Sequence, residues 1–193
     1  AGLRLQEKIW NRKEFDGWEL RDKTLGIVGL GKVGSNVANI ASGFGMNLIA
    51  YDPYISREKF EKFSAKKANS LKELLNCADM VTIHTPKTRE TMGMFDYLSL
   101  KEMKPGSVLV NCARGGIVDE ESLLRVLDEG HLLRAGIDVF EEEPCVGNPL
   151  HFHPHCICTP HLGASTVEAQ SRVGKTIAVQ MAKALKNGVV DYP

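Results

Sequence analysis

Residues Thr24 to Gly34 carry the clearest indication of the fold; they read Thr-Leu-Gly-Ile-Val-Gly-Leu-Gly-Lys-Val-Gly. The first half of this stretch is a short apolar run, which is typical of a buried strand, and a helix is expected to follow it. Between the two, Gly29, Gly31 and Gly34 have the spacing G-x-G-x-x-G. In such a unit the first glycine permits a tight turn, the second lets a pyrophosphate approach the backbone, and the third lets the helix pack on the strand. Free N–H groups at the start of the helix would attract the phosphates.

An acidic residue follows at the distance that this unit requires. Asp52 comes directly after the next predicted strand, Met46 to Tyr51. Its carboxylate would accept hydrogen bonds from the ribose hydroxyls of adenosine and would repel a 2′-phosphate, so the sequence favours NAD over NADP. Two alternatives stay open. In the first, Asp52 does not bind ribose and only caps the turn before Pro53. In the second, the positive charge of Arg57 offsets the negative charge of Asp52 and weakens the preference for NAD.

The rest of the chain repeats the alternation of strand and helix. Further strands are predicted at Met80–His84, Ser107–Asn111, Arg134–Val139 and Cys156–Thr159, and helices are predicted after the N-cap residues Ser70, Asp119 and Thr166. Alternation of this kind predicts βαβ units and a parallel sheet covered on both faces. We therefore expect an α/β fold with a doubly wound, mostly parallel sheet of the Rossmann type over residues 21–193. An amphipathic helix is expected over residues 3–11.

Composition excludes several functional classes. The chain has 193 residues, with 24 Lys and Arg against 24 Asp and Glu, so no basic surplus favours direct contact with nucleic acid. No apolar run is long enough to cross a membrane. Five cysteines, an odd number in a chain that can bury its own core, indicate reduced thiols and a cytoplasmic protein.

Three chemically suited residues follow predicted strands. Arg114 lies beyond the strand ending at Asn111, Glu143 follows the strand of residues 134–139, and His161 follows the strand of residues 156–159. The carboxyl ends of parallel strands form the edge of the sheet where ligands bind. A histidine can donate and accept a proton near neutral pH, a carboxylate can orient it, and an arginine can clamp a carboxylate with two parallel bonds. Each residue alone is ordinary, and it is their joint placement that predicts catalysis.

The segment from His151 to His161 also contains many residues that bind metals. Cys156 and Cys158 alternate on a strand and so point to one side. The spacing fits no C-x-x-C pattern, and Pro154 and Pro160 restrict how the ligands would converge. We therefore predict no metal.

At this point the sequence resembles a known family. The glycine fingerprint, Cys-Ala-Arg-Gly-Gly at 112–116, the Glu143-Pro144 pair and Pro-His-Leu-Gly-Ala-Ser-Thr at 160–166 resemble the D-isomer-specific 2-hydroxyacid dehydrogenases. The segments around Arg114 and His161 most resemble members that act on 3-phosphoglycerate in serine biosynthesis. The resemblance implies that Arg114 binds the substrate carboxylate, that His161 is the acid and base, and that Glu143 is its partner.

The resemblance also implies an NAD site and a homodimer. The residues implied to bind the cofactor are Gly29, Gly31, Lys32, Val33, Gly34, Asp52, Thr85, Pro86, Cys112, Ala113, Asp138, Gly163 and Ala164. Lys32 and Val33 would lie against the pyrophosphate, Thr85 and Pro86 would line the adenosine side, and Asp138 with Gly163 would hold the nicotinamide carboxamide.

One departure from the family is large, because the substrate-binding domain of its members is absent from this sequence. Residues 1–20 are interpreted as the crossover helix and linker from that domain, and the chain alone is expected to be inactive. Two alternatives remain. The substrate would be another D-2-hydroxy acid, as in glyoxylate, hydroxypyruvate or D-lactate enzymes, or the domain would be a binding module like the NAD-sensing corepressors that share this fold.

Overall fold

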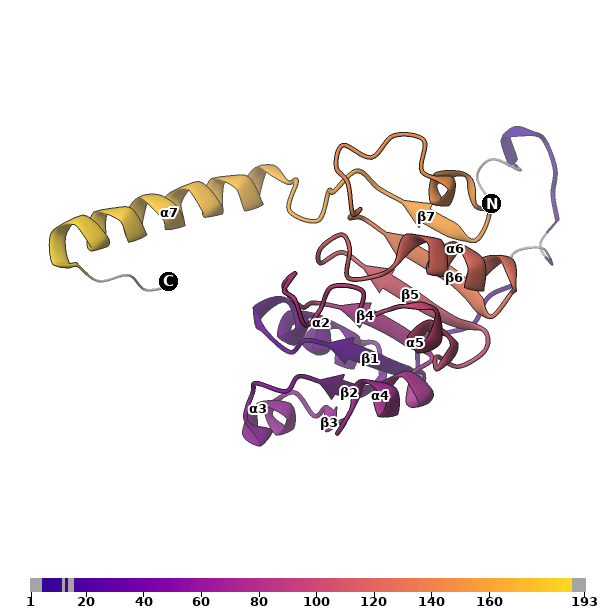
Figure 1. Cartoon of the computed structure of the whole chain (residues 1–193), viewed down its shortest axis with the longest axis horizontal. Coiled ribbons are helices and arrows are strands. Elements are labelled where there is room, and N and C mark those ends of the chain that lie inside the picture. Colours follow the sequence, from indigo (N-terminus) through magenta and orange to yellow (C-terminus); the bar gives the residue numbers. More distant parts are fainter. Residues whose placement is uncertain (1–4, 12, 14–15, 189–193) are drawn as a thin grey trace.

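A single sheet organises the computed structural model, which describes residues 5–11, 13 and 16–188. Seven strands, all parallel, lie in the order β3-β2-β1-β4-β5-β6-β7 (Figure 1). The strands are β1 (Thr24–Val28), β2 (Asn47–Tyr51), β3 (Lys66–Lys67), β4 (Met80–Ile83), β5 (Ser107–Asn111), β6 (Leu132–Ile137) and β7 (Cys156–Cys158). The α-helices are α2 (Lys32–Gly43), α3 (Arg57–Lys62), α4 (Leu71–Cys77), α5 (Tyr97–Lys101), α6 (Glu120–Asp128) and α7 (Val167–Asn187), and η2 (Pro149–Phe152) is a 3₁₀ turn. The order of strands reverses direction at β1 and β4, as in a doubly wound sheet.

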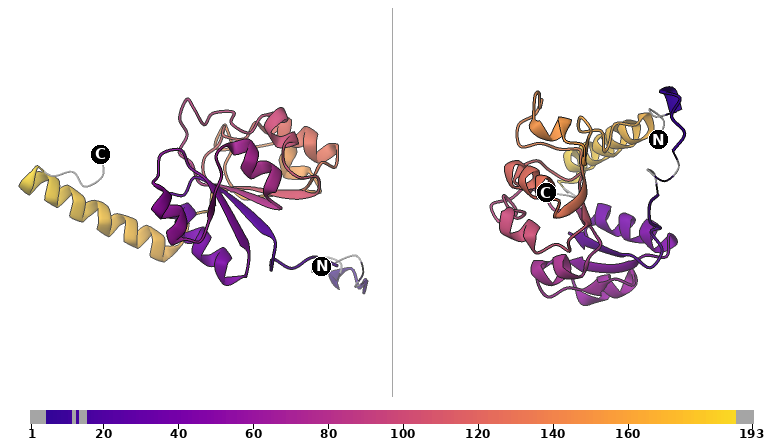
Figure 2. Two further views of the ribbon diagram at one scale, coloured as in Figure 1. Left: turned by 90° about the horizontal axis from the view of Figure 1, so that it is seen from below. Right: turned by 90° about the vertical axis from the view of Figure 1, so that its right-hand side faces the viewer.

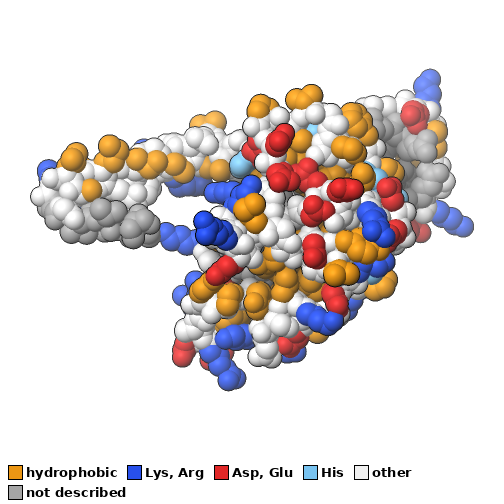
Figure 3. All heavy atoms as spheres, in the orientation of Figure 1, with side chains coloured by type: hydrophobic (Ala, Val, Ile, Leu, Met, Phe, Trp, Pro, Cys, Tyr) orange, Lys and Arg blue, Asp and Glu red, His pale blue; other side chains and the backbone are white. Residues whose placement is uncertain are grey.

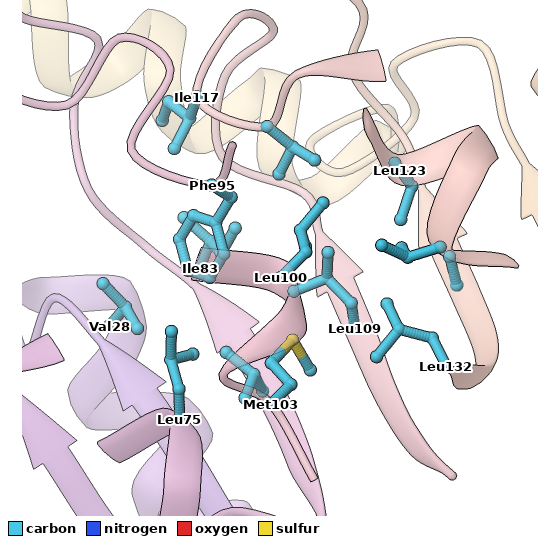
Figure 4. Packing of buried hydrophobic residues seen from close by; sticks show 14 of the residues in the cluster. Val28, Leu75, Ile83, Phe95, Leu100, Met103, Leu109, Ile117, Leu123 and Leu132 are labelled. Atoms are coloured by element: carbon cyan, nitrogen blue, oxygen red, sulfur yellow. The ribbon is translucent and has the colours of Figure 1, made fainter. Parts of the chain in front are cut away.

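Helices lie on both faces of this sheet (Figure 2). Helices α4, α5 and α6 cover one face, where Leu75, Leu100 and Leu123 pack with Ile83 and Leu109 from the strands (Figure 4). Helices α2 and α3 cover the other face and bury a smaller cluster with β1 and β2. Strands β1, β2 and β4 are therefore buried along most of their length, as expected for parallel strands covered from both sides.

The second face is covered only in part, which differs from the prediction of two covered faces. Helix α2 packs on β1 and β2, and beyond it Ile157 of β7 is 72% exposed. Helix α7 extends away from the sheet (Figure 1), so Val173, Ile177 and Met181 are exposed. None of the helices within the described residues combines the length and the apolar character that crossing a membrane requires.

Local side-chain caps start several helices where the sequence predicts them. The side chains of Ser70, Asp119 and Thr166 each accept a hydrogen bond from a backbone N–H one turn into the helix. Each cap satisfies one of the donors that a helix start leaves unpaired. Glu73 lies three residues after Ser70, which is the spacing of a capping box. Only half of the box forms, because the Glu73 carboxylate accepts the N–H of Asn69 rather than that of Ser70.

Short elements escaped prediction. Helices α3 and α5, strand β3 and the turn η2 are too short to show a period in the sequence. The helix predicted over residues 3–11 is wrong beyond its start. Residues 3 and 4 lie outside the described residues, Leu5 and Gln6 are helical, and Lys8 has a φ of 58°, which does not continue a helix.

Candidate active site

The glycine loop between β1 and α2 has one open position and two crowded ones. Gly29 has a φ of 90°, and a Cβ there would lie 2.7 Å from the carbonyl oxygen of His84. At Gly34 a Cβ would lie 2.0 Å from the oxygen of Gly29, so the helix approaches the turn through this residue. At Gly31, by contrast, a Cβ would meet nothing within 4 Å. The fold itself requires the outer two glycines, whereas the middle one leaves space at the start of the helix for a ligand.

Asp52 joins the glycine loop to the loop after β2. Its Oδ2 accepts the backbone N–H of Leu30 at 2.9 Å, and its Oδ1 accepts the N–H of Tyr54 at 3.0 Å. The residue therefore caps its own turn and also fixes the loop that precedes α2. Arg57 bonds to Glu61 on its own helix at 3.1 Å and is 82% exposed, so its charge is engaged away from Asp52.

A cavity of about 400 Å³ lies beside this loop. Gly29, Gly31, Asp52, Thr85 and Pro86 line it. The hydroxyl oxygen of Thr85 is buried and has no hydrogen-bond partner among the described residues. A buried hydroxyl without a partner is costly, so this atom is one that a ligand would satisfy. The empty space at Gly31, the carboxylate of Asp52 and this hydroxyl together fit the adenosine and phosphate groups of a dinucleotide.

His161 and Glu143 come together from different loops. His161 Nδ1 lies 2.7 Å from Glu143 Oε2, and Glu143 Oε1 accepts the backbone N–H of Phe140 at 3.0 Å. The hydrogen bond from His161, followed by the one from Phe140, lowers the pKa of the Glu143 carboxyl below its usual range. Both side chains line a second cavity of about 430 Å³. Glu143 is therefore held ionised beside the ring, and Nε2 is the nitrogen left for other partners.

The backbone of the His161 loop is held by Asp138, a role that sequence reasoning missed. Asp138 is 4% exposed, and its carboxylate accepts the N–H groups of Leu162 at 2.7 Å and Gly163 at 2.8 Å, as well as the hydroxyl of Thr159. Its carbonyl oxygen accepts the N–H of His161 at 2.9 Å. The backbone of His161 has a φ of 55°, in the left-handed region that residues other than glycine rarely adopt. The feature of the sequence that could have indicated this role is an acidic residue, Asp138, directly after the strand β6.

Arg114 lies on the loop after β5, which a buried asparagine holds. The side chain of Asn111 accepts the N–H of Ala113 at 3.0 Å and donates to the carbonyl of Arg114 at 3.1 Å. Arg114 is exposed, and one arm of its guanidinium donates to the carbonyl of Ala113 at 2.6 Å. The next residue is tightly packed, because a Cβ on Gly115 would lie 1.7 Å from the carbonyl oxygen of Phe140. This contact brings the Arg114 loop against the segment that leads to Glu143.

The remaining residues suggested by the sequence lie along the same edge. Lys32 and Val33 open α2, Cys112 is exposed beside Ala113, and Ala164 follows Gly163 in the His161 loop. Both oxygens of the Asp138 carboxylate bond to the protein, and its contact with the nicotinamide carboxamide stays a prediction. Within the described part of the chain, no three His, Cys, Asp or Glu side chains lie together as a metal ion would require. There the thiols of Cys156 and Cys158 lie 3.6 Å apart on one side of β7.

Comparison with protein families gives a match across most of the chain. Residues 2–163 match the model described as "D-isomer specific 2-hydroxyacid dehydrogenase, NAD binding domain". The chain is 45% identical over 188 residues to D-3-phosphoglycerate dehydrogenase of Bacillus subtilis (strain 168), covering 96% of this chain and 36% of the relative. It is 48% identical over 186 residues to the Pan troglodytes protein of the same name, covering 96% of this chain and 35% of the relative. The chain thus spans about a third of the length of these relatives.

Solved structures with the same fold differ in what they act on. A glyoxylate reductase from Paecilomyes thermophila superposes with a TM-score of 0.88 at 32% identity, over 97% of this chain and 57% of that one. An NAD-dependent formate dehydrogenase from Staphylococcus aureus in complex with NAD has a TM-score of 0.84 at 33% identity, over 96% of this chain and 56% of that one. The shared architecture therefore accompanies several substrates.

Proposed function

The chain belongs to the D-isomer-specific 2-hydroxyacid dehydrogenase family as an NAD-binding domain, and from that premise we propose that it supplies the cofactor site and the acid–base pair for oxidation of a small D-2-hydroxy acid, with 3-phosphoglycerate as substrate. The observation that carries this proposal is the 2.7 Å contact between His161 Nδ1 and Glu143 Oε2. It places a carboxylate-oriented imidazole at the carboxyl edge of the sheet, where ligands bind in folds of this kind.

His161 is proposed as the group that exchanges the substrate proton. When Nδ1–H donates to Glu143, the ring presents Nε2 as its free acceptor. Nε2 takes the hydroxyl proton of the hydroxy acid during oxidation and returns it during reduction of the keto acid. Bound NAD supplies the hydride acceptor for the oxidation. The ionised Glu143 stabilises the imidazolium that forms, as an acidic partner does for other catalytic histidines.

Arg114 is proposed as the clamp for the substrate carboxylate. A guanidinium can give two parallel hydrogen bonds to a carboxylate, which fixes the orientation of the substrate as well as its position. The bond from Arg114 to the carbonyl of Ala113 and the bonds made by Asn111 hold the loop in place. Orientation matters because well-placed reactants gain roughly 7 to 11 kcal/mol over free ones.

The cofactor residues carried over from the family are proposed in the same way. Asp52 accepts the ribose hydroxyls through lone pairs that its two backbone bonds leave available. The start of α2 receives the pyrophosphate, and the hydroxyl of Thr85 bonds to the adenosine half. Cys112, Ala113 and Gly163 border the nicotinamide, and Asp138 acts mainly by holding the loop of His161.

We also propose that the protein is a cytoplasmic homodimer, with residues 1–20 as the link to a substrate domain. The five cysteines of the described chain are all free thiols. Large apolar side chains are exposed at every fourth residue of α7, at Val173, Ile177, Met181 and Leu185, and this spacing sets them in a row. Figure 3 shows hydrophobic side chains along this helix. A row of this kind is a surface that another chain or domain would cover. Light scattering of the protein at the length of its relatives tests the dimer.

The test of the activity is a steady-state assay of the protein extended to the length of its relatives. NADH and a panel of keto acids, namely 3-phosphohydroxypyruvate, glyoxylate, hydroxypyruvate and pyruvate, are compared by kcat/KM. The phosphorylated substrate is expected to give the highest value. A higher value for another acid would replace the substrate, and NAD binding without turnover of any acid would favour the binding-module alternative.

A further inference from the structure

Two residues that no motif singles out meet at the cavity beside the glycine loop. Tyr54 follows Asp52 on the loop after β2, and Glu90 lies on the loop after β4; both line the cavity. The hydroxyl of Tyr54 donates a hydrogen bond to Glu90 Oε2. This bond and the charge of Glu90 raise the pKa of the Tyr54 hydroxyl, which therefore stays protonated and able to donate. The contact joins two loops that are 36 residues apart in the chain.

The place of this pair along the cavity indicates which part of a dinucleotide it would meet. The glycine loop at the start of α2 suits phosphate. Asp52 accepts the N–H of Leu30 in that loop and suits the ribose. Asp52 also accepts the N–H of Tyr54, whose hydroxyl bonds to Glu90, so a chain of contacts runs from the glycine loop through Asp52 to Glu90. Because base, ribose and phosphate are joined in that order, the adenine base falls beside Glu90.

We propose that Glu90 recognises the adenine base of NAD by accepting a hydrogen bond from its 6-amino group, and that Tyr54 is the residue that positions the Glu90 carboxylate. This inference rests on the proposed cofactor site. His84 and Asp52 also line the cavity, and both make hydrogen bonds within the protein. The ring of His84 bonds to the hydroxyl of Thr82 at 3.0 Å, and Asp52 bonds to the backbone on both sides.

The chemistry of the pair predicts discrimination between bases. An ionised carboxylate only accepts hydrogen bonds, and the 6-amino group of adenine only donates them. Hypoxanthine has a carbonyl oxygen at that position, which also only accepts. Placed against Glu90, that oxygen would face a negative charge without a proton between them. The site should therefore prefer NAD to nicotinamide hypoxanthine dinucleotide, which differs in the base alone.

The experiment is calorimetric titration of the 193-residue chain with each dinucleotide. The unaltered chain is expected to bind NAD about 10-fold more tightly, the lower end of the range for a hydrogen bond to a charged group, because Glu90 is exposed to water. Glu90→Gln should reduce the preference to about 2-fold or less, because an amide can either accept from an amine or donate to a carbonyl. Tyr54→Phe should give an intermediate preference, with the carboxylate kept but less well placed.

Glu61→Gln is the matched control, since it removes an exposed acid from nearby α3 that does not line the cavity. It should retain the full preference for NAD. Equal binding of both dinucleotides by the unaltered chain, or an unchanged preference in Glu90→Gln, would overturn the inference while leaving the cofactor site intact. An equal loss in Glu61→Gln would show a general charge effect and would also overturn it. Failure to bind either dinucleotide would instead refute the proposed cofactor site.

Discussion

Replacing Asp138 by Asn tests whether this carboxylate holds the His161 loop. Asp138 Oδ1 accepts from Leu162 N–H and from the hydroxyl of Thr159, and Oδ2 accepts from Gly163 N–H at 2.8 Å. An amide keeps one oxygen and places an NH₂ group at the other position. If the oxygen replaces Oδ1, the N–H of Gly163 faces another donor and loses its partner.

The size of the effect follows from these bonds. A hydrogen bond to a charged group contributes about 1.5 to 3 kcal/mol, and a buried donor without a partner costs about 1 to 3 kcal/mol. The side chain is 4% exposed, so water does not replace the lost bond. We expect the free energy of unfolding to fall by about 3 kcal/mol. In a domain of this size that corresponds to a fall in Tm of about 6–12 °C.

The assay combines urea unfolding of this chain with turnover by the protein at the length of its relatives. Asp79→Asn is the matched control, because Asp79 also accepts two hydrogen bonds, from Thr24 N–H at 2.8 Å and from Lys104 Nζ at 2.9 Å. It lies before β4, at the opposite edge of the sheet from His161. Both variants should lose stability, and only Asp138→Asn should also lower kcat, by about 100-fold if the ring moves by about 1 Å.

Three outcomes would contradict the proposed role of Asp138. If Asp138→Asn unfolds at the same urea concentration as the unaltered chain, the three hydrogen bonds contribute nothing measurable. If it loses stability and keeps its kcat, Asp138 supports the fold without positioning His161. An equal loss of kcat in Asp79→Asn would attribute the effect to general destabilisation.

Three further predictions concern the cofactor, the pH and the acid–base group. Gly31→Val should leave the free energy of unfolding nearly unchanged, since a Cβ there meets nothing within 4 Å. The same variant should bind NAD more weakly in calorimetry. An unaltered affinity would show that the phosphates do not bind at this loop. Burial raises the pKa values of Asp79 and Asp138, but the hydrogen bonds that each accepts outweigh it, and the bonds to Glu143 act in the same direction, so all three carboxyl pKa values lie below their usual range. Their stabilisation is therefore complete above the unfolded pKa values and should be lost as the pH falls below about 4. Urea midpoints that stay constant from pH 6 to pH 3 would contradict this. His161→Ala should lower kcat by roughly 10²- to 10⁴-fold in the protein at the length of its relatives. The 193-residue chain alone should bind NAD with little or no turnover. Comparable kcat/KM for the short and long chains would show that one domain suffices.

Local features of the fold could be predicted because they depend on neighbours in the chain. The cap residues Ser70, Asp119 and Thr166 act within one turn of their helices, so spacing alone reveals them. Helices α3 and α5 could not be found in this way, because six and five residues are too few to show a period. The uncovered part of the second face was also beyond prediction, since coverage depends on where distant helices pack.

The glycine loop and Asp52 were determined by sequence alone, because a strand, a turn and a helix of this spacing can place those residues in only one way. The contacts between side chains from loops far apart in the chain depend on the tertiary structure. The resemblance already implied Glu143 as the partner of His161, and the structure adds the 2.7 Å distance between them. Only the structure shows that Asp138 holds the His161 loop and that Glu90 meets Tyr54. The physical reason is that a hydrogen bond forms over about 3 Å of space whatever the distance along the chain. Only the packed sheet brings loops from separate strands to that distance.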